Sequence, residues 1–169
     1  MSKDIDIEKL KKSTNHIGLA VFIIAILLII SQMGSLILTL VLSSGTLDIL
    51  PEEIVTMLSQ NISSIYIFII YAIVEVLVLL SVLVISNKVK NDDLMNPDKT
   101  SRNVLLLTLF FILRVLINMI YDLTPMYIHY SDGTTEASRT FSIPIFEIII
   151  LIVLIKNLVN LNKYIKNGY

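Results

Sequence analysis

The chain has 169 residues, of which 55% are hydrophobic and 16% are charged, and its net charge at pH 7 is -1. This composition is too apolar for an ordinary soluble domain, and a charge so close to zero says nothing about partners. Because the chain contains no cysteine, disulfides, thiolate metal sites and cysteine nucleophiles are excluded.

Four apolar runs, each framed by charged residues, have the length that a membrane-spanning helix needs, which is roughly 20 residues. They cover residues 17–42, 62–85, 104–121 and 141–161. Each run should be a helix, because a helix satisfies its own backbone hydrogen bonds in lipid. The alternative, a soluble helical core, would need a covering layer that the short connecting segments cannot supply. The sequence therefore predicts a single all-α integral membrane domain with four transmembrane helices.

The distribution of lysine and arginine predicts the orientation of these helices. Basic residues concentrate in segments 1–16, 86–103 and 162–169, whereas segment 43–61 has none and segment 122–140 has only Arg139. By the positive-inside rule, both termini should be cytoplasmic, and the two segments with few or no basic residues should be outer loops. We therefore expect a multi-pass plasma-membrane protein, and the bias towards Ile, Asn and Lys is typical of a low-GC bacterium.

Acidic residues accompany the lysines of the first two inner segments. The sequence thus predicts no polybasic patch for anionic lipid or nucleic acid.

The connecting segments contain a few local signals. In the first outer loop, Pro51 and the two glutamates after it are typical of a helix start, so a short amphipathic surface helix is expected within residues 43–61. In the second outer loop, residues 131–135 are polar and glycine-containing and predict a mobile turn. In the inner loop, Ser101 is the expected cap of the third helix.

Small or weakly polar residues recur every seven positions along the first helix. Such a stripe lets membrane helices approach closely and form hydrogen bonds. We interpret it as a helix-packing seam rather than a ligand site. Its members are Gly18, Ala25, Gln32 and Thr39.

Ionised residues inside the apolar runs are the most informative feature, since a charge at membrane depth is costly and usually faces a partner or water. With a rise of about 1.5 Å per residue, Glu75 and Arg114 fall near the same depth and should be able to pair. Glu147 falls about one turn further outward, and Asn118 follows Arg114 on one helix face. An intramembrane polar cluster of Glu75, Arg114, Asn118 and Glu147 is therefore predicted.

Two interpretations of this cluster remain open. In the structural one, a buried ion pair fixes the helix arrangement, since such pairs specify geometry more reliably than they add stability. In the functional one, the cluster lines an outward-opening polar cavity in which burial and the neighbouring cation tune a carboxylate pKa.

The sequence offers no catalytic or metal-binding constellation. His16 and His129, the only two histidines, are expected on opposite sides of the membrane, so a shared metal site is not predicted. No serine lies with a base at a common depth, and no glycine-rich phosphate loop is present. We therefore expect no catalytic residue, no metal and no cofactor.

Residues 9–20, which run from paired lysines into a long apolar helix, resemble the amino-terminal start of bacterial CPBP proteins, the family of CAAX proteases and bacteriocin-processing enzymes. The order of the first three spans is also similar. Residues 144–147 resemble the start of the family's first catalytic motif, a Glu-Glu pair followed by Arg. Here only Glu147 matches, because Ile148 and Ile152 stand at the other two positions. The resemblance thus implies a shortened, non-catalytic relative, or a protein that retains only the front half of the family's fold.

The sequence as a whole favours a non-enzymatic membrane protein that acts as a subunit, an immunity-type protein or a regulatory partner of a membrane complex. A small oligomeric transporter or proton-coupled channel that uses Glu75 and Arg114 is the alternative, and an inactive CPBP-like protease relative comes third. The expected partners are the lipid bilayer and another membrane protein or a second copy of the chain, with no nucleic acid.

Overall fold

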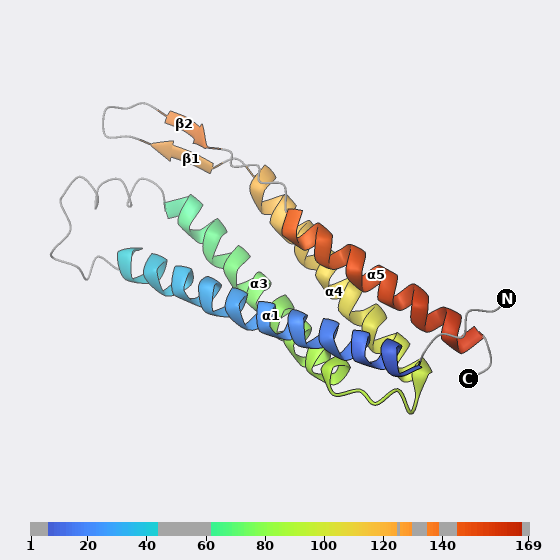
Figure 1. Ribbon diagram of the computed structural model, residues 1–169. Helices are drawn as coiled ribbons and strands as arrows, with labels where there is room; N and C mark the ends of the chain where they lie inside the picture. The colour runs from blue at the N-terminus through green and yellow to red at the C-terminus, as the bar shows by residue number, and fades with distance from the viewer. Residues whose placement is uncertain (1–6, 44–61, 125, 130–134, 139–144, 167–169) are drawn as a thin grey trace. The chain divides into compact units, whose positions relative to one another are not determined.

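The structure is a computed structural model that describes residues 7–43, 62–124, 126–129, 135–138 and 145–166 (Figure 1). The described residues contain four helices that are long and apolar enough to cross a membrane, which confirms the predicted all-α membrane class. In chain order, the elements are α1 (Ile7–Ser43), α3 (Ile62–Lys90), α4 (Pro97–Leu123), β1 (Met126–His129), β2 (Thr135–Ser138) and α5 (Ile145–Lys166).

Lipid explains why these sequences are helical. The first half of α5 reads IFEIIILIVLI, and isoleucine and valine favour strands over helices in water. A lone strand in a bilayer would leave its backbone N–H and C=O groups without partners, whereas a helix satisfies them internally. The solvent therefore overrides the intrinsic preference of the residues.

All four helices extend beyond the apolar runs that predicted them, and α3 continues to Lys90. Helix α1 starts at Ile7, ten residues before the expected span, and α4 starts at Pro97. Helix α5 continues to Lys166. The added turns are rich in lysine and polar residues, many of which are good helix formers in water, so each helix continues past the apolar stretch into its charged flank.

The prediction that Ser101 caps the third helix is wrong. Asn96 is the cap: its side-chain Oδ1 accepts a hydrogen bond from the Lys99 backbone N–H at 3.1 Å, and its carbonyl accepts one from Thr100 N–H at 3.1 Å. Pro97 takes the first helical position, where its missing N–H costs nothing. Ser101 lies inside the first turns and donates instead to Asn162 of α5 at 2.8 Å.

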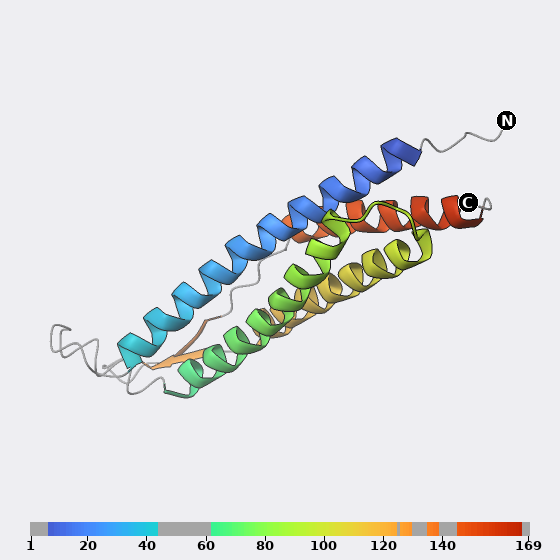
Figure 2. The ribbon, with the colours of Figure 1, turned by 90° about the horizontal axis from the view of Figure 1, so that it is seen from below.

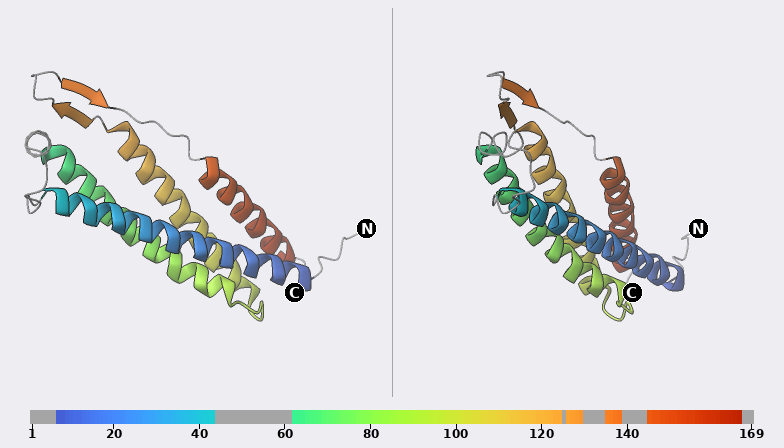
Figure 3. Two further views of the ribbon diagram at one scale, coloured as in Figure 1. Left: turned by 60° about the vertical axis from the view of Figure 1, so that its left-hand side comes forward. Right: turned by 90° about the vertical axis from the view of Figure 1, so that its left-hand side faces the viewer.

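Part of the second predicted outer loop is a hairpin rather than irregular chain. Strands β1 and β2 pair antiparallel with Met126 opposite Ser138 and His129 opposite Thr135 (Figure 3). Each strand has four residues, which is too short for an alternation of polar and apolar residues to be recognised. The sequence therefore did not reveal the hairpin. The rest of the predicted turn at 131–135, and the amphipathic helix expected within 43–61, lie outside the described residues.

The chain divides into two compact units. The first unit comprises Met1–Leu28, Val78–Val115 and Pro144–Tyr169, and the second comprises Ile29–Leu77 and Leu116–Ile143. The main apolar core lies in the first unit, where segments of all four helices contribute to it. Its members are Leu10, Val21, Ala25, Val82, Val89, Leu94, Val104, Leu107, Phe111, Leu154, Leu161 and Tyr164.

Helices α1 and α3 approach closely within the first unit. A Cβ atom added at Gly18 would lie 2.5 Å from the backbone N of Lys90 and 2.9 Å from its Cα. The ammonium of Lys90 in turn sits 4.2 Å from the centre of the Phe22 ring, a cation–π contact. Gly18, a member of the small-residue stripe, therefore permits the helix contact.

The connection between α3 and α4 in the first unit is short and held by side-chain hydrogen bonds (Figure 2). Asp92 Oδ1 accepts hydrogen bonds from Leu94 N–H at 2.9 Å and from the Thr100 hydroxyl at 2.7 Å. Leu94 has a φ of 61°, in the left-handed region that is costly for a branched residue. Its side chain is buried in the core, and that burial offsets the backbone cost.

Candidate functional site

A chain of polar side chains crosses the second unit from α1 to α4. The Gln32 amide donates a hydrogen bond to Glu75 Oε2 and also approaches the Tyr71 hydroxyl oxygen at 3.4 Å. The Tyr71 hydroxyl donates to Asn118 Oδ1 at 3.0 Å. Each group thus uses a partner on another helix, and Glu75, only 1% exposed, receives a donor at membrane depth.

Aromatic rings cover one side of this polar chain. Tyr71 and Tyr121 stack with ring centres 3.9 Å apart and planes 15° from parallel, and Phe68 lies 6.4 Å from both rings in tilted geometry. Phe68, Tyr71 and Glu75 follow one another at helical spacing on α3. The rings therefore shield the hydrogen bonds and fix the angle between α3 and α4 in this unit.

The first unit contains an ion pair between α4 and α5. Arg114 Nη1 lies 3.1 Å from Glu147 Oε1, with side-chain exposures of 4% and 19%. The Arg114 guanidinium carbon also lies 5.9 Å from the centre of the Phe111 ring, within the range of a cation–π contact. Glu147 occupies the first turn of α5, where the positive end of the helix dipole also favours a carboxylate.

Two residues of the predicted cluster lie in each unit. Glu75 and Asn118 belong to the polar chain of the second unit, and Arg114 and Glu147 form the ion pair of the first. The predicted pairing of Arg114 with Glu75 joins residues of different units and stays a prediction.

Members of the α1 stripe have different roles. Gly18 and Ala25 are buried in the first unit and serve packing. Gln32, interpreted from sequence as part of the same seam, forms a hydrogen bond to the buried carboxylate. Thr39 donates to the carbonyl of Ser35 on its own helix at 2.9 Å.

Sequence reasoning did not identify Tyr71, although it links Gln32 to Asn118. The available signal was its position four residues before Glu75, which places the two side chains on one face of a helix. Tyrosine also occurs in membrane helices where only its ring packs. The spacing of Tyr71 and Glu75 therefore gave little reason to assign a hydrogen-bonding role to Tyr71.

This arrangement can hold a carboxylate and a guanidinium at membrane depth, each with at least one polar partner. Among the residues that the structure describes, no group of three or more His, Asp or Glu side chains could hold a metal ion.

Comparison of the chain with protein-family models, with curated proteins and with solved structures finds no match.

Proposed function

We propose that this chain is a non-enzymatic, multi-pass membrane protein that acts as a subunit, an immunity-type protein or a regulatory partner of a membrane complex. The observation that carries the proposal is the mutual pairing of its membrane-depth polar groups. Arg114 pairs with Glu147, and Glu75, Gln32, Tyr71 and Asn118 form one hydrogen-bonded chain. Groups that pair in this way serve helix arrangement first.

The apolar surface of α1 supports an external partner. Only 11% of its most apolar 18-residue window is buried within the chain, against 33% for α4. Ile30 is 63% exposed and Leu27 is 61% exposed. Lipid can cover such a surface, and so can another membrane helix, because association in the bilayer depends on close packing rather than on the hydrophobic effect.

The proposal includes a location. The charge distribution favours a plasma membrane with both termini in the cytoplasm, in a bacterium. Because the chain has no cysteine, single-cysteine reporters give a direct test in intact cells. A membrane-impermeant thiol reagent should label Ser44→Cys and should leave Lys88→Cys unlabelled until the cells are opened; the reverse pattern would contradict this orientation.

The partner can be sought by photo-crosslinking along α1 in native membranes. A photoreactive residue placed at Ile30 or Leu27 should give a discrete product larger than the chain, and one at the buried Ala25 should not. Identification of that product as one membrane protein, different from this chain, supports the proposal. Products only with the chain itself, or none at any exposed α1 position, would argue against it.

One observation favours the second candidate, an oligomeric proton-coupled channel or transporter. Glu75 is a buried carboxylate in a hydrogen-bonded chain, a common element of proton pathways in membranes. Reconstituted protein would then dissipate a pH gradient across liposomes by proton flux. Glu75→Gln would abolish this flux. Glu8→Gln, at an exposed carboxylate outside the chain of hydrogen bonds, would leave it unchanged. The CPBP-like protease relative remains the third candidate, and the resemblance behind it stays a prediction.

A further inference from the structure

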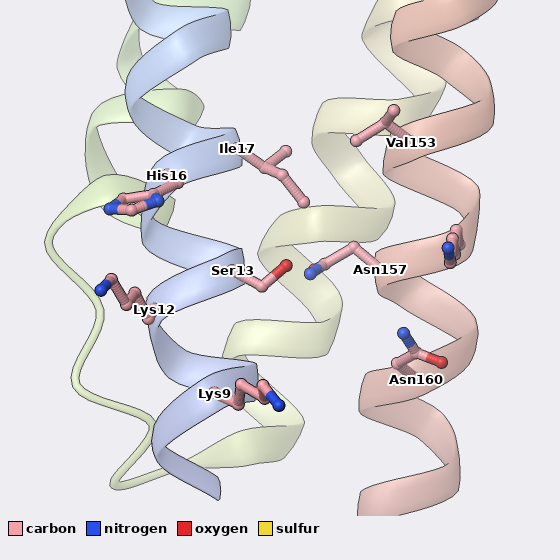
Figure 4. A pocket seen from close by; sticks show the side chains of 9 residues that line it. Lys9, Lys12, Ser13, His16, Ile17, Val153, Asn157 and Asn160 are labelled. Atoms are coloured by element: carbon pink, nitrogen blue, oxygen red, sulfur yellow. The ribbon is translucent and has the colours of Figure 1, made fainter. Parts of the chain in front are cut away.

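A basic pocket lies between α1 and α5 in the first unit, at the ends of these helices that carry the N-terminal and C-terminal lysines (Figure 4). Its volume is about 500 Å³, within the range of small-molecule sites. Lys9 and Lys12 of α1 and Lys156 of α5 contribute three positive charges, and His16 adds a titratable ring. The residues that line it include no acidic side chain.

Two helix faces build the pocket. Lys9, Lys12 and His16 follow one another at intervals of three and four residues on α1, so their side chains share a face. Lys156 and Asn160 do the same on α5. The sequence predicted no basic patch because these lysines belong to segments far apart in the chain and those of α1 lie near acidic residues. They come together only because α1 packs on α5.

Neutral polar groups occupy the space between the lysines. In Figure 4 Ser13 points from α1 towards α5, and Asn157 points back towards α1. Asn157 is 3% exposed, and its amide donates to the Thr14 hydroxyl at 3.2 Å. This hydrogen bond joins α1 to α5 beside the pocket.

The pocket changes character along the helix axis. Ile17 and Val153 line the end nearer the middle of the helices, and Lys9 and Asn160 line the end nearer the termini. Lys9 and Ile17 are eight residues apart, which corresponds to about 12 Å of helix. An occupant with a charged end and an apolar end would therefore match the pocket in a single orientation.

We propose that this pocket binds a phosphate-bearing anion. Lysine ammonium groups, a serine hydroxyl and an asparagine amide are all donors suited to phosphate oxygens. Two features favour the phosphodiester headgroup of an anionic lipid as its source: the pocket lies at the ends of two membrane-length helices, and its inner end is apolar. Basic pockets between membrane helices on the cytoplasmic side are typical sites for such headgroups.

The test measures binding to the purified full-length protein in a mild non-ionic detergent. Three probes are titrated separately: short-chain phosphatidylglycerol, phosphatidylcholine of the same chain length, and inorganic phosphate. Phosphatidylglycerol should bind saturably and phosphatidylcholine far more weakly. The variant with Lys9→Gln, Lys12→Gln and Lys156→Gln should lose about a hundredfold in affinity, given the usual contribution of a basic residue near a lipid surface.

A matched variant separates the pocket from general charge. Lys88, Lys99 and Lys163 are exposed lysines of the same unit that do not line the pocket. Their joint replacement by Gln removes the same charge and should change the affinity by less than about threefold. Thermal unfolding followed by circular dichroism checks that both triple variants fold as the parent does, which is expected because all six positions are at or near the surface.

The outcomes are distinct. Pocket-dependent binding of phosphatidylglycerol alone supports the proposal with a lipid as the source. Pocket-dependent binding of inorganic phosphate, in competition with phosphatidylglycerol, supports the proposal with a soluble phosphate compound as the source. Equal losses in the two triple variants, or no preference for phosphatidylglycerol and phosphate over phosphatidylcholine, would overturn it. None of these results depends on whether the chain has a protein partner.

Discussion

The ion pair between Arg114 and Glu147 allows a quantitative test by double substitution. Arg114 Nη1 lies 3.1 Å from Glu147 Oε1, and both side chains are largely buried. A charged side chain placed at the middle of a membrane helix costs about 2.5–3.5 kcal/mol. Glu147→Gln, which leaves the guanidinium, should therefore lower the free energy of unfolding by about 3 kcal/mol. Arg114→Gln should cost less, about 2 kcal/mol, since Glu147 is more exposed and lies at a helix N-terminus.

The double variant provides the decisive comparison. With Arg114→Gln and Glu147→Gln together no charge of the pair is stranded, so the loss should be about 1 kcal/mol, smaller than that of either single variant. Reversible unfolding in mixed micelles of dodecyl sulfate and maltoside, followed by circular dichroism, measures all three. Losses that simply add would refute the reasoning that the two residues stabilise one another.

Three further predictions use the same unfolding measurement. Gly18→Ala should lower the free energy of unfolding by more than about 2 kcal/mol, because its Cβ would collide with the α3 backbone. Gly34→Ala, with no atom within 4 Å of the new Cβ, should be neutral or stabilising by up to about 1 kcal/mol. Equal effects of the two substitutions would contradict the close helix contact. Tyr71→Phe should lower the free energy of unfolding by about 1–2 kcal/mol because the hydroxyl is lost, and Tyr66→Phe, at an exposed ring, should leave it almost unchanged. An unchanged stability of the Tyr71→Phe variant would rule out the hydrogen-bonded chain as a stabilising element. Asn96→Ala should lose about 1 kcal/mol and Asn96→Asp should retain the cap; if Asp behaves like Ala, the side chain does not cap α4.

The pairing of Glu75 with Arg114, predicted from sequence, has its own test. If the two residues pair, Arg114→Leu should lower the folded yield, and Glu75→Gln combined with Arg114→Gln should recover much of it. Full yield of the Arg114→Leu single variant would contradict the pairing. The result also shows whether Arg114 interacts with one carboxylate or two.

The sequence predicted the fold class well because membrane helices follow from run length and backbone satisfaction alone. It also singled out Gly18 in a stripe of small residues, and in the structure Gly18 lies at a close helix contact. It located the helix ends less well. Ser101 and Asn96 are both acceptable caps, and only the position of Pro97 in the first turn decides between them.

The sites were harder to predict, because they depend on how each helix is rotated about its axis. Position along a helix comes from residue number, so the sequence could place Glu75 and Asn118 along their own helices. Whether Gln32 meets Glu75, or Tyr71 meets Asn118, depends on rotation, which tertiary packing sets. The basic pocket was missed for the same reason, since Lys12 and Lys156 line one pocket only when α1 packs on α5.

The most direct test of the proposed function is the mass of the assembly released from native membranes. The chain, expressed at its natural level with a small affinity tag, would be extracted in mild detergent and weighed by native mass spectrometry. We expect a complex of fixed stoichiometry that contains a different membrane protein. A monomer, or an oligomer of this chain alone, would contradict the account, and an oligomer with Glu75-dependent proton flux would favour transport instead.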